Sequence, residues 1–341
     1  MRERSPAKHE RSPAMPQLEG FPQVSIIIPC FRHGRLLGQA VDSALAQTHR
    51  FIEVIVVNDG SEDETEDVAR SFGDRIQYVR KENGGLSSAR NAGIRLARGQ
   101  YLLFLDADDL LHPEAAERLV AAAGSSGDRM AMMGVRRFAA EHDRTSGPVM
   151  IPAFHGLLAP EIFVHNHPVH GILCPRAAIV AAGGFDESLQ AVEDWDLWIR
   201  VALRGIDVVS IPWCGAFYRQ VAGSMSSDRS SMAHAKCRMF GKAWVAVRNR
   251  DHFWRFWAGS FLRSLYAVRR NCKALGLESE IPLIQEMIDE IRSRGIRVCP
   301  ASPAALRLQD AAPAAVGDYL EAAGLSLARL CWPSFYDRCK N

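Results

Sequence analysis

The sequence lacks the features that mark membrane-spanning, exported and nucleic-acid-binding proteins. No apolar run approaches the ~20 residues that a membrane-spanning helix needs. Residues 1–20 contain acidic side chains and no apolar core of a signal peptide. The formal net charge of +2 is too small to indicate a nucleic acid as a partner. We therefore expect a cytoplasmic protein that has no nucleic-acid partner.

The sequence also lacks any Cys-x-x-Cys pair, although it contains eight cysteines. A zinc ribbon or a thioredoxin-like site is therefore not expected. The cysteines stand among apolar neighbours, as Cys30 does, so we expect buried free thiols in a reducing compartment. His165, His167 and His170 have no carboxylate or cysteine at a suitable spacing, and Pro168 interrupts the segment. We interpret this segment as a loop and not as a zinc site.

What is present is an ordinary globular composition, with 48% hydrophobic and 23% charged residues. Residues 1–20 are charged, contain proline and repeat the letters Glu-Arg-Ser-Pro-Ala, which predicts a disordered tail. From about residue 231, arginine and aromatic residues interleave with helical spacing. We expect a first folded domain over residues 21–228 and a mainly helical C-terminal region over residues 229–341.

Short apolar runs rich in β-branched residues alternate with helical patterns in the first domain. A parallel sheet covered by helices on both faces gives this pattern, so we predict an α/β fold. Ser61 and Glu64 predict a capping box at the start of the helix after the second strand. Strands are predicted over residues 24–28, 53–57, 76–79, 101–105, 208–211 and 215–218, and helices over 36–47, 87–97, 195–203 and 314–330.

Three of the predicted strands end at residues that can face a ligand. These residues are Pro29, Asp59 and Asp106. In sheets of this kind ligands bind beyond the carboxyl ends of the strands, so one crevice can collect all three. Asp59 could accept the N–H of a pyrimidine base there. A common Asp-Gly turn is the alternative, and for this motif alone we favour it.

The sharpest local signal is the run of three carboxylates Asp106, Asp108 and Asp109 directly after a buried strand. Such a cluster is unfavourable unless positive charge meets it. A divalent cation with a diphosphate would suit, because Mg²⁺ or Mn²⁺ takes one or two carboxylates and completes its shell with phosphate oxygens and water. The alternative is an acidic turn that caps the next helix, and Asp109 fits that role as well.

Two further segments could act at the same crevice. Gly84 and Gly85 allow close backbone approach, and Arg90 on the following helix can face an anion or a base. The alternative there is a plain loop with a surface arginine. Glu193 and Asp194 begin a predicted helix, and the helix dipole favours negative charge at this end. A carboxylate of this pair can deprotonate a substrate hydroxyl. The alternative here is a helix cap followed by core tryptophans.

Together these motifs resemble the family-two glycosyltransferases with the A-type nucleotide-sugar fold, GT-A. The resemblance spans about residues 24–227. It implies a mostly parallel, Rossmann-like central sheet flanked by helices, with a helical C-terminal appendage. The segments that carry it are residues 24–29, 57–61, 84–91, 105–109, 183–187, 193–198 and 218–219.

The resemblance implies a role for each matched residue. Asp108 corresponds to the ligand of a divalent cation, Mg²⁺ or Mn²⁺, with Asp106 beside it. Asp194 corresponds to the catalytic base and Glu193 to its supporting carboxylate. The residues that would bind the nucleotide-sugar donor are Pro29, Phe31, Asp59, Gly85, Arg90, Asp106 and Arg219.

On the acceptor side the resemblance points to Gly184 and Trp195, with the histidine-containing loop nearby. Two positions depart from the family pattern. Phe31 stands where the family usually has tyrosine, so stacking is kept and a hydroxyl contact is lost. Val221 stands where many members have a histidine, which puts a histidine contact to the metal or the pyrophosphate in doubt.

The implied reaction is the inverting transfer of a sugar from a UDP- or dTDP-linked donor to a hydroxyl of a glycan or glycolipid. One alternative is an enzyme that loads sugar onto a polyprenyl-type lipid phosphate. Another is a non-catalytic relative that only binds nucleotide-sugar. The aromatic and basic residues near positions 253–270 could form an amphipathic helix at the cytoplasmic membrane face. We favour the alternative, in which they pack on the first domain.

Overall fold

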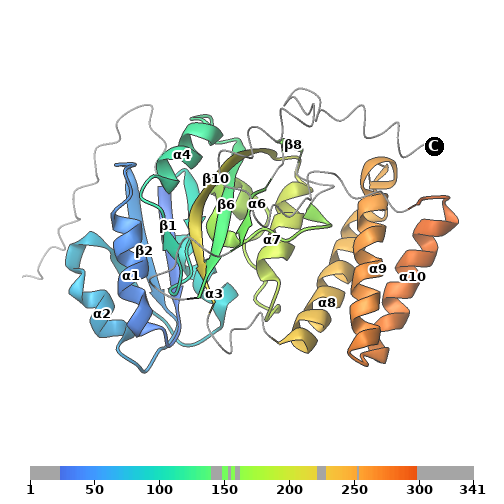
Figure 1. Ribbon diagram of the computed structural model, residues 1–341, viewed down its shortest axis with the longest axis horizontal. Coiled ribbons are helices and arrows are strands. Elements are labelled where there is room, and N and C mark those ends of the chain that lie inside the picture. The colour runs from blue at the N-terminus through green and yellow to red at the C-terminus, as the bar shows by residue number, and fades with distance from the viewer. Residues whose placement is uncertain are drawn as a thin grey trace, which may run out of the picture.

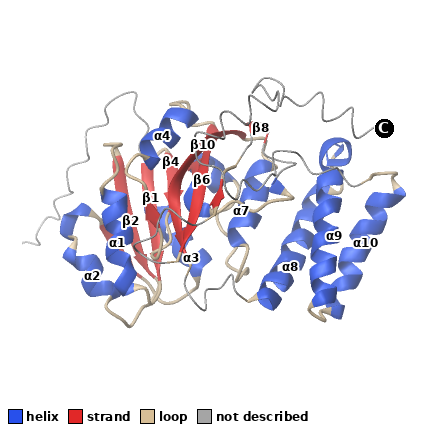
Figure 2. Cartoon of the chain, viewed as in Figure 1, coloured by secondary structure: helices blue, strands red, loops and turns tan. Residues whose placement is uncertain are grey.

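The computed structural model describes residues 24–139, 148–152, 155–157, 162–220, 228–251 and 253–297. Within these ranges a central sheet with flanking helices is followed by a group of long helices at its side (Figure 1; Figure 2). The tail predicted for residues 1–20, the helix predicted over residues 314–330 and Val221 lie outside the described residues.

The elements of the α/β part have the following bounds. The strands are β1 (Val24–Cys30), β2 (Ile52–Asn58), β3 (Gln77–Arg80), β4 (Tyr101–Phe104), β5 (Leu110–Leu111), β6 (Arg129–Phe138), β7 (Val149–Met150), β8 (His155–Leu157), β9 (Ile172–Pro175) and β10 (Asp207–Arg219). The helices are α1 (Gly34–Leu45), α2 (Thr65–Ser71), α3 (Leu86–Leu96), α4 (Ala115–Ala123), α6 (Arg176–Ala181) and α7 (Glu193–Ala202), with short 3-10 turns η1 (Gly73–Arg75) and η2 (Val169–Gly171).

The sheet confirms the predicted α/β fold. Its strand order is β3-β2-β1-β4-β9-β6-β10-β5. β1 pairs in parallel with β2 and β4, and β2 pairs in parallel with β3. β9 runs antiparallel to both β4 and β6, which makes the sheet mixed. One face packs on α1, α2 and α4 and the other on α3 and α7, so both faces are covered as the apolar strands require.

Two local predictions are wrong. The strands expected over residues 208–211 and 215–218 are one strand, β10, whose pairing with β6 shifts register twice near its middle. Such irregularities break the alternation of side chains on which a sequence-based prediction depends. Ser61 does not cap α2. The Asp63 carboxylate instead accepts hydrogen bonds from the backbone N–H groups of Thr65, at 3.2 Å, and Gly34, at 3.0 Å.

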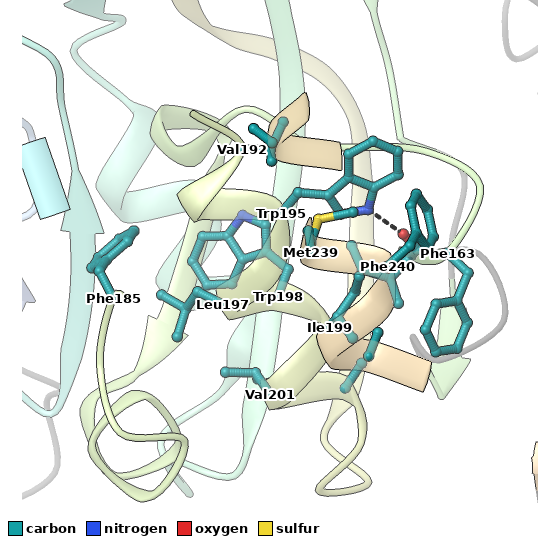
Figure 3. Close-up of a cluster of buried hydrophobic side chains, with 14 of the residues drawn as sticks. Phe163, Phe185, Val192, Trp195, Leu197, Trp198, Ile199, Val201, Met239 and Phe240 are labelled. Carbon is teal, nitrogen blue, oxygen red and sulfur yellow. Dashed lines mark hydrogen bonds between the residues drawn. The ribbon is translucent and has the colours of Figure 1, made fainter. Parts of the chain in front are cut away.

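The C-terminal helices pack against α7 through a shared hydrophobic core. These elements are α8 (Arg229–Val247), the π-helical turn η4 (Phe253–Trp257), α9 (Ala258–Ala274), the short turn η5 (Glu278–Glu280) and α10 (Ile281–Ser293). Figure 3 shows Trp195 of α7 beside Phe240 of α8, with ring centroids 5.6 Å apart. Phe240 in turn meets Phe261 of α9 at 5.4 Å.

This core accounts for the aromatic residues that the sequence placed at a membrane surface or on the first domain. Phe253, Phe261 and Leu262 are buried, so these side chains pack inside the protein. None of the described helices is long and apolar enough to cross a membrane. The described cysteines are free thiols, and Cys30, Cys174, Cys237 and Cys272 are buried, as expected.

Gly93 lets α3 lie directly on β1, which leads to a stability prediction. A Cβ atom at this position would lie 2.3 Å from Cγ2 of the buried Ile27. Overpacking of this kind typically costs about 1–3 kcal/mol. Gly93→Ala is therefore expected to lower the free energy of unfolding, measured by urea denaturation, although alanine favours helix.

Gly38 is the matched control, because a Cβ there meets only an ordinary contact at 3.8 Å. Gly38→Ala should be neutral or stabilising by up to about 1 kcal/mol, and equal effects of the two substitutions would contradict the packing argument.

Candidate active site

The carboxyl ends of β1, β2 and β4 open into one cavity of about 780 Å³. Five carboxylates from three separate parts of the sequence line it. Asp59 follows β2, Asp106 and Asp108 follow β4, and Glu193 and Asp194 begin α7. Parallel strands bring their carboxyl ends to the same edge of the sheet, and this explains how acids so distant in sequence meet.

Pro29 and Phe31 line the same cavity just past the end of β1. Phe31 is 40% exposed, which is unusual for so large an apolar side chain. An exposed ring at a cavity rim offers a flat apolar surface to a planar ligand. The placement of these two residues therefore suits the nucleobase walls that the resemblance implies.

Asp59 holds the glycine turn of the cavity wall. Its Oδ1 accepts hydrogen bonds from Lys81 Nζ at 2.6 Å and from the Gly84 N–H at 3.0 Å. Its Oδ2 accepts the Gly85 N–H at 2.8 Å. Gly85 has a φ of +88°, a conformation that favours glycine, and it also lines the cavity. These contacts support the alternative interpretation, in which Asp59 stabilises a turn. Asp59 also lines the cavity.

Arg90 is buried between the two acidic halves of the site. Its Nη2 lies 2.7 Å from Asp106 Oδ1 and its Nη1 lies 2.7 Å from Glu193 Oε1. Only 2% of the Arg90 side chain is exposed. Burial lowers the pKa of Arg90, but the two carboxylates outweigh burial and hold the pKa above its ordinary value. Arg90 is therefore a fixed positive charge that ties the loop after β4 to the start of α7.

Asp194 has the properties of a carboxylate that can exchange a proton. Asn166 Nδ2 donates hydrogen bonds to both of its oxygens, at 3.1 and 3.2 Å, and so fixes its orientation. Burial, and then the neighbouring Glu193 carboxylate, raise the pKa of Asp194 to about 7, against the opposing effect of Arg90. A pKa near neutrality is what a general base at physiological pH requires.

The acidic loop after β4 is held from below by Arg219. The Arg219 N–H donates to Asp109 Oδ1 at 2.7 Å, and Arg219 Nε donates to the Asp108 carbonyl at 2.8 Å. A third hydrogen bond runs from Arg219 Nη2 to Gln39 Oε1 at 2.8 Å. Arg219 is not among the residues that line the cavity, so the structure places this predicted donor-binding residue as a support for the loop.

Three side chains converge in a way that suits a metal ion, and two of them, Asp106 and His170, line the cavity. One ligand atom each of Asp106, Asp109 and His170 lies within 4.8 Å of the others. The predicted pair Asp106 and Asp108 both line the cavity, but Asp108 is not in this converging group. The sequence indicated that no carboxylate lies near His170. In the folded protein two carboxylates do, because η2 places this histidine beside the loop after β4.

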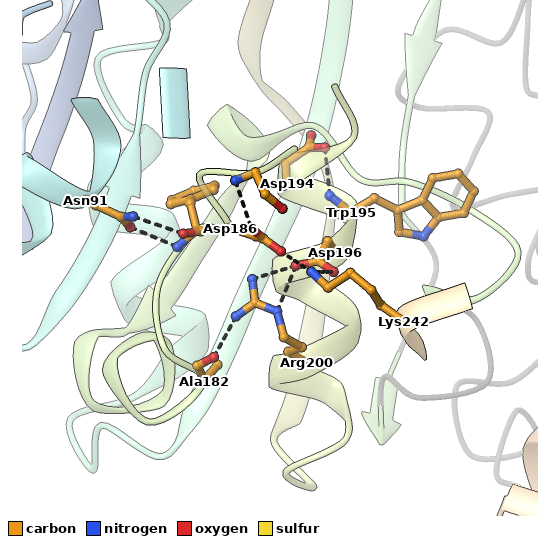
Figure 4. Close-up of polar contacts among 10 residues, drawn as sticks. Asn91, Ala182, Asp186, Asp194, Trp195, Asp196, Arg200 and Lys242 are labelled. Carbon is orange, nitrogen blue, oxygen red and sulfur yellow. Dashed lines mark hydrogen bonds and ion pairs between the residues drawn. The ribbon is translucent and has the colours of Figure 1, made fainter. Parts of the chain in front are cut away.

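Two predicted acceptor-side residues lie away from the cavity. Trp195 is 7% exposed, and its Nε1 donates a hydrogen bond to the carbonyl of Ile162 within the core (Figure 3). Helix geometry turns successive side chains about 100° apart, so Trp195 faces the core when Asp194 faces the cavity. Gly184 has a φ of +70°, and its loop is anchored on α3 by Asn91 (Figure 4).

A separate polar network fixes the far side of α7. The Asp196 carboxylate pairs with Arg200 one turn later, at 2.7 Å, and with Lys242 of α8, at 3.1 Å (Figure 4). Lys242 also pairs with Asp186 in the loop before α7. These contacts anchor the helix whose first turn carries Glu193 and Asp194, so the acid pair stands on a rigid element.

Sequence reasoning missed several residues of this site. Asn166, His170 and Tyr218 all line the cavity, and His33 does so from the loop after β1. The polar residues around positions 165–170 were placed only in a loop near the acceptor side, and residues 218–219 were only part of the family resemblance; neither signal gives the distant residues that these side chains face. Residues in loops that meet only in the folded state have no local pattern that could identify them.

Comparison with known proteins agrees with this geometry. Residues 25–174 match the family described as Glycosyl transferase family 2. The uncharacterized glycosyltransferase RP339 of Rickettsia prowazekii is 37% identical over 199 residues, which cover 52% of this chain and 58% of that protein. The uncharacterized glycosyltransferase EpsJ of Bacillus subtilis is 34% identical over 192 residues, which cover 51% of this chain and 54% of that protein. The chain thus spans little more than half the length of these relatives.

Solved structures show the same fold. S. aureus TarS in complex with UDP-GlcNAc superposes with a TM-score of 0.53 at 16% identity, over 80% of this chain and 92% of that chain. The mannosyltransferase PcManGT from Pyrobaculum calidifontis, in complex with GDP-Man and Mn²⁺, gives a TM-score of 0.52 at 18% identity, over 96% of this chain and 88% of that chain. At these identities the likeness concerns the fold. Residues 25–174 thus match the model of family-2 glycosyltransferases, and the described fold is the one that these two solved glycosyltransferase structures share.

Proposed function

We propose that the protein is an inverting glycosyltransferase that moves a sugar from a nucleoside-diphosphate donor to a hydroxyl group of a glycan or glycolipid. The observation that carries the proposal is the single cavity in which Asp59, Asp106, Asp108, Glu193 and Asp194 meet. UDP-sugars and dTDP-sugars are the proposed donors, and a UDP-sugar occupies the TarS structure. The catalytic domain is proposed to extend over residues 21–228, since α8 begins at Arg229.

The proposed chemistry is a single displacement at the anomeric carbon of the sugar. The Asp194 carboxylate accepts the proton of the acceptor hydroxyl, whose oxygen forms a bond to the anomeric carbon. The bond from that carbon to the diphosphate oxygen breaks on the opposite face, and its electron pair leaves with the nucleoside diphosphate. Asn166 keeps the carboxylate of Asp194 in a fixed orientation, which reduces the entropy cost of the proton transfer.

The acidic loop fits a divalent cation by the chemistry of its donors. Carboxylate oxygens are ligands that Mg²⁺ and Mn²⁺ accept, and Asp106 and Asp108 both face the cavity. A cation held there would neutralise the charge of the departing diphosphate. Burial and the neighbouring Asp106 raise the pKa of Asp108 and so disfavour its charged form. A cation would stabilise that charged form.

Donor binding gives a direct test of this proposal. Mn²⁺ together with the correct nucleotide-sugar, at about 100 times its dissociation constant, should stabilise the protein by about 2.7 kcal/mol. Thermal unfolding with UDP-, dTDP- and GDP-linked sugars, with and without Mn²⁺, measures this. Asp106→Asn should lose the metal-dependent part of the shift, because Asp106 faces the cavity in the acidic loop. Asp207→Asn is the control, because Asp207 is half-exposed and pairs with Arg129 away from the cavity. The proposal fails if no nucleotide-sugar shifts the transition of the wild-type protein.

A further inference from the structure

His170 lines the cavity, and Asp109 is a fully buried residue beside it that is not part of the cavity lining; the hydrogen-bonding capacity of both side chains is only partly used. Asp109 is 0% exposed and His170 is 2% exposed. Asp109 Oδ1 accepts one backbone N–H, but Asp109 Oδ2 and both ring nitrogens of His170 make no hydrogen bond to the described residues. The Asp109 Oδ2 and His170 Nδ1 atoms nevertheless lie 3.2 Å apart. Buried polar atoms without partners are unfavourable by about 1–3 kcal/mol each, so such a group requires an explanation.

The positive charges nearby are already engaged elsewhere. The guanidinium of Arg90 is divided between Asp106 and Glu193. The guanidinium of Arg219 donates to the Asp108 carbonyl and to Gln39. Burial and the neighbouring carboxylates of Asp106 and Asp108 raise the pKa of Asp109, and the smaller effect of the Arg219 charge, which lowers this pKa, does not offset them. The Asp109 side chain therefore stays charged only when an external cation joins it.

From this geometry we propose that Asp109 and His170 join Asp106 as direct ligands of a divalent cation at the part of the cavity wall that Asp106 and His170 form. Ligand atoms within 4.8 Å of one another are close enough to share one ion. Two carboxylate oxygens and one imidazole nitrogen form a mixed donor set that favours Mn²⁺ over Mg²⁺, which prefers oxygen ligands alone. This inference rests on the proposed function, because it assigns the protein ligands of the cation in that site.

The position of His170 is fixed by its neighbours, as a metal ligand requires. Its ring stacks on Tyr218 with centroids 5.5 Å apart and planes 15° apart. The next residue, Gly171, lets η2 approach β6 closely, because a Cβ there would lie 2.8 Å from Val135 Cγ2 and 3.1 Å from the Met133 carbonyl. A side chain held in this way loses little entropy when it binds an ion.

Pulsed EPR spectroscopy of bound Mn²⁺ tests the inference. The full chain is prepared free of metal, with ¹⁵N-labelled histidine, and receives less than one equivalent of Mn²⁺ without nucleotide. We expect a hyperfine coupling from one histidine nitrogen to the manganese ion. The experiment needs no variant, so it does not depend on whether a substituted protein folds. Bound Mn²⁺ that lacks any ¹⁵N coupling would overturn the assignment of His170.

Two variants identify the histidine. His170→Gln should abolish the ¹⁵N coupling and weaken Mn²⁺ binding at least about tenfold, since removal of even an outer-shell partner typically costs that much. His167→Gln is the matched control. His167 is also buried in the same segment, but it does not line the cavity, so the coupling should persist. A coupling that survives His170→Gln would contradict the proposal.

Failure of this inference can be separated from failure of the proposed function. A protein that binds a nucleotide-sugar with Mn²⁺ but shows no histidine coupling keeps the function and loses the ligand assignment. A protein that shows the coupling but neither binds nor transfers any nucleotide-sugar keeps the metal site and loses the function. Calorimetric titration of the same samples with UDP-sugars provides the second measurement.

Discussion

Replacing Asp194 by asparagine is expected to lower the turnover rate about 10²–10⁴-fold, the usual contribution of a general base. The amide keeps the size of the side chain and can still bond to Asn166, but it cannot accept the proton of the acceptor hydroxyl. Donor binding should change little, because the acceptor proton is removed only in the chemical step. The measurement is sugar transfer with the donor identified by thermal unfolding, followed by release of the nucleoside diphosphate.

The pH profile gives the same prediction a second form. Burial and the Glu193 carboxylate raise the pKa of Asp194 to about 7, so the base is protonated below that pH. For the wild-type enzyme, kcat/KM should therefore fall tenfold per pH unit below about 7 and level off above it. The residual activity of Asp194→Asn should lack this dependence.

Asp207→Asn is the control for the Asp194 substitution, because it makes the same chemical change at a half-exposed acid that does not line the cavity. It should keep the wild-type rate and pH profile. The expected loss for a general base is about 10²–10⁴-fold. A turnover rate of Asp194→Asn within roughly a factor of three of the wild-type rate would therefore show that Asp194 is not the base.

Arg90→Met is expected to lower the free energy of unfolding by about 3–5 kcal/mol, because it breaks a buried ion-pair group by removing one member. The substitution leaves Glu193, which is 8% exposed, and Asp106 without their shared cation. Methionine still fills the space over the Phe185 ring, which lies 5.1 Å from the Arg90 guanidinium. Urea unfolding followed by tryptophan fluorescence measures the change.

A double-mutant cycle separates the charge effect from packing. Glu193→Gln removes one of the two stranded carboxylates, so Arg90→Met with Glu193→Gln should be less destabilised than the sum of the single changes by about 0.5–3 kcal/mol. Arg129→Met serves as the control, because its ion pair with Asp207 is nearly half exposed. Exposed pairs contribute about 0–1 kcal/mol. Strict additivity, or equal losses at Arg90 and Arg129, would remove the case for Arg90 as the link between the two acidic segments.

The sequence predicted the first half of the sheet well because its strands are short, apolar and bounded by turns. β1 to β4 begin and end within two residues of the predicted runs. β10 was split in two because its pairing with β6 is irregular, and no local pattern encodes a register shift. The first turn of α2 was expected to be capped by Ser61, but the Asp63 carboxylate accepts the Thr65 N–H there, because Ser and Asp are both common near helix starts and only backbone geometry selects between them.

The amino-acid sequence by itself determined which acids stand at strand ends and at the start of a helix, because hydrophobic periodicity places each element and its last residue. Only the tertiary structure decided which side chains share a site. It turned Trp195 into the core, placed Arg219 beneath the acidic loop and brought His170 beside Asp109. These contacts join residues far apart in the chain, so they depend on how loops and helices pack, and local patterns carry no record of that packing.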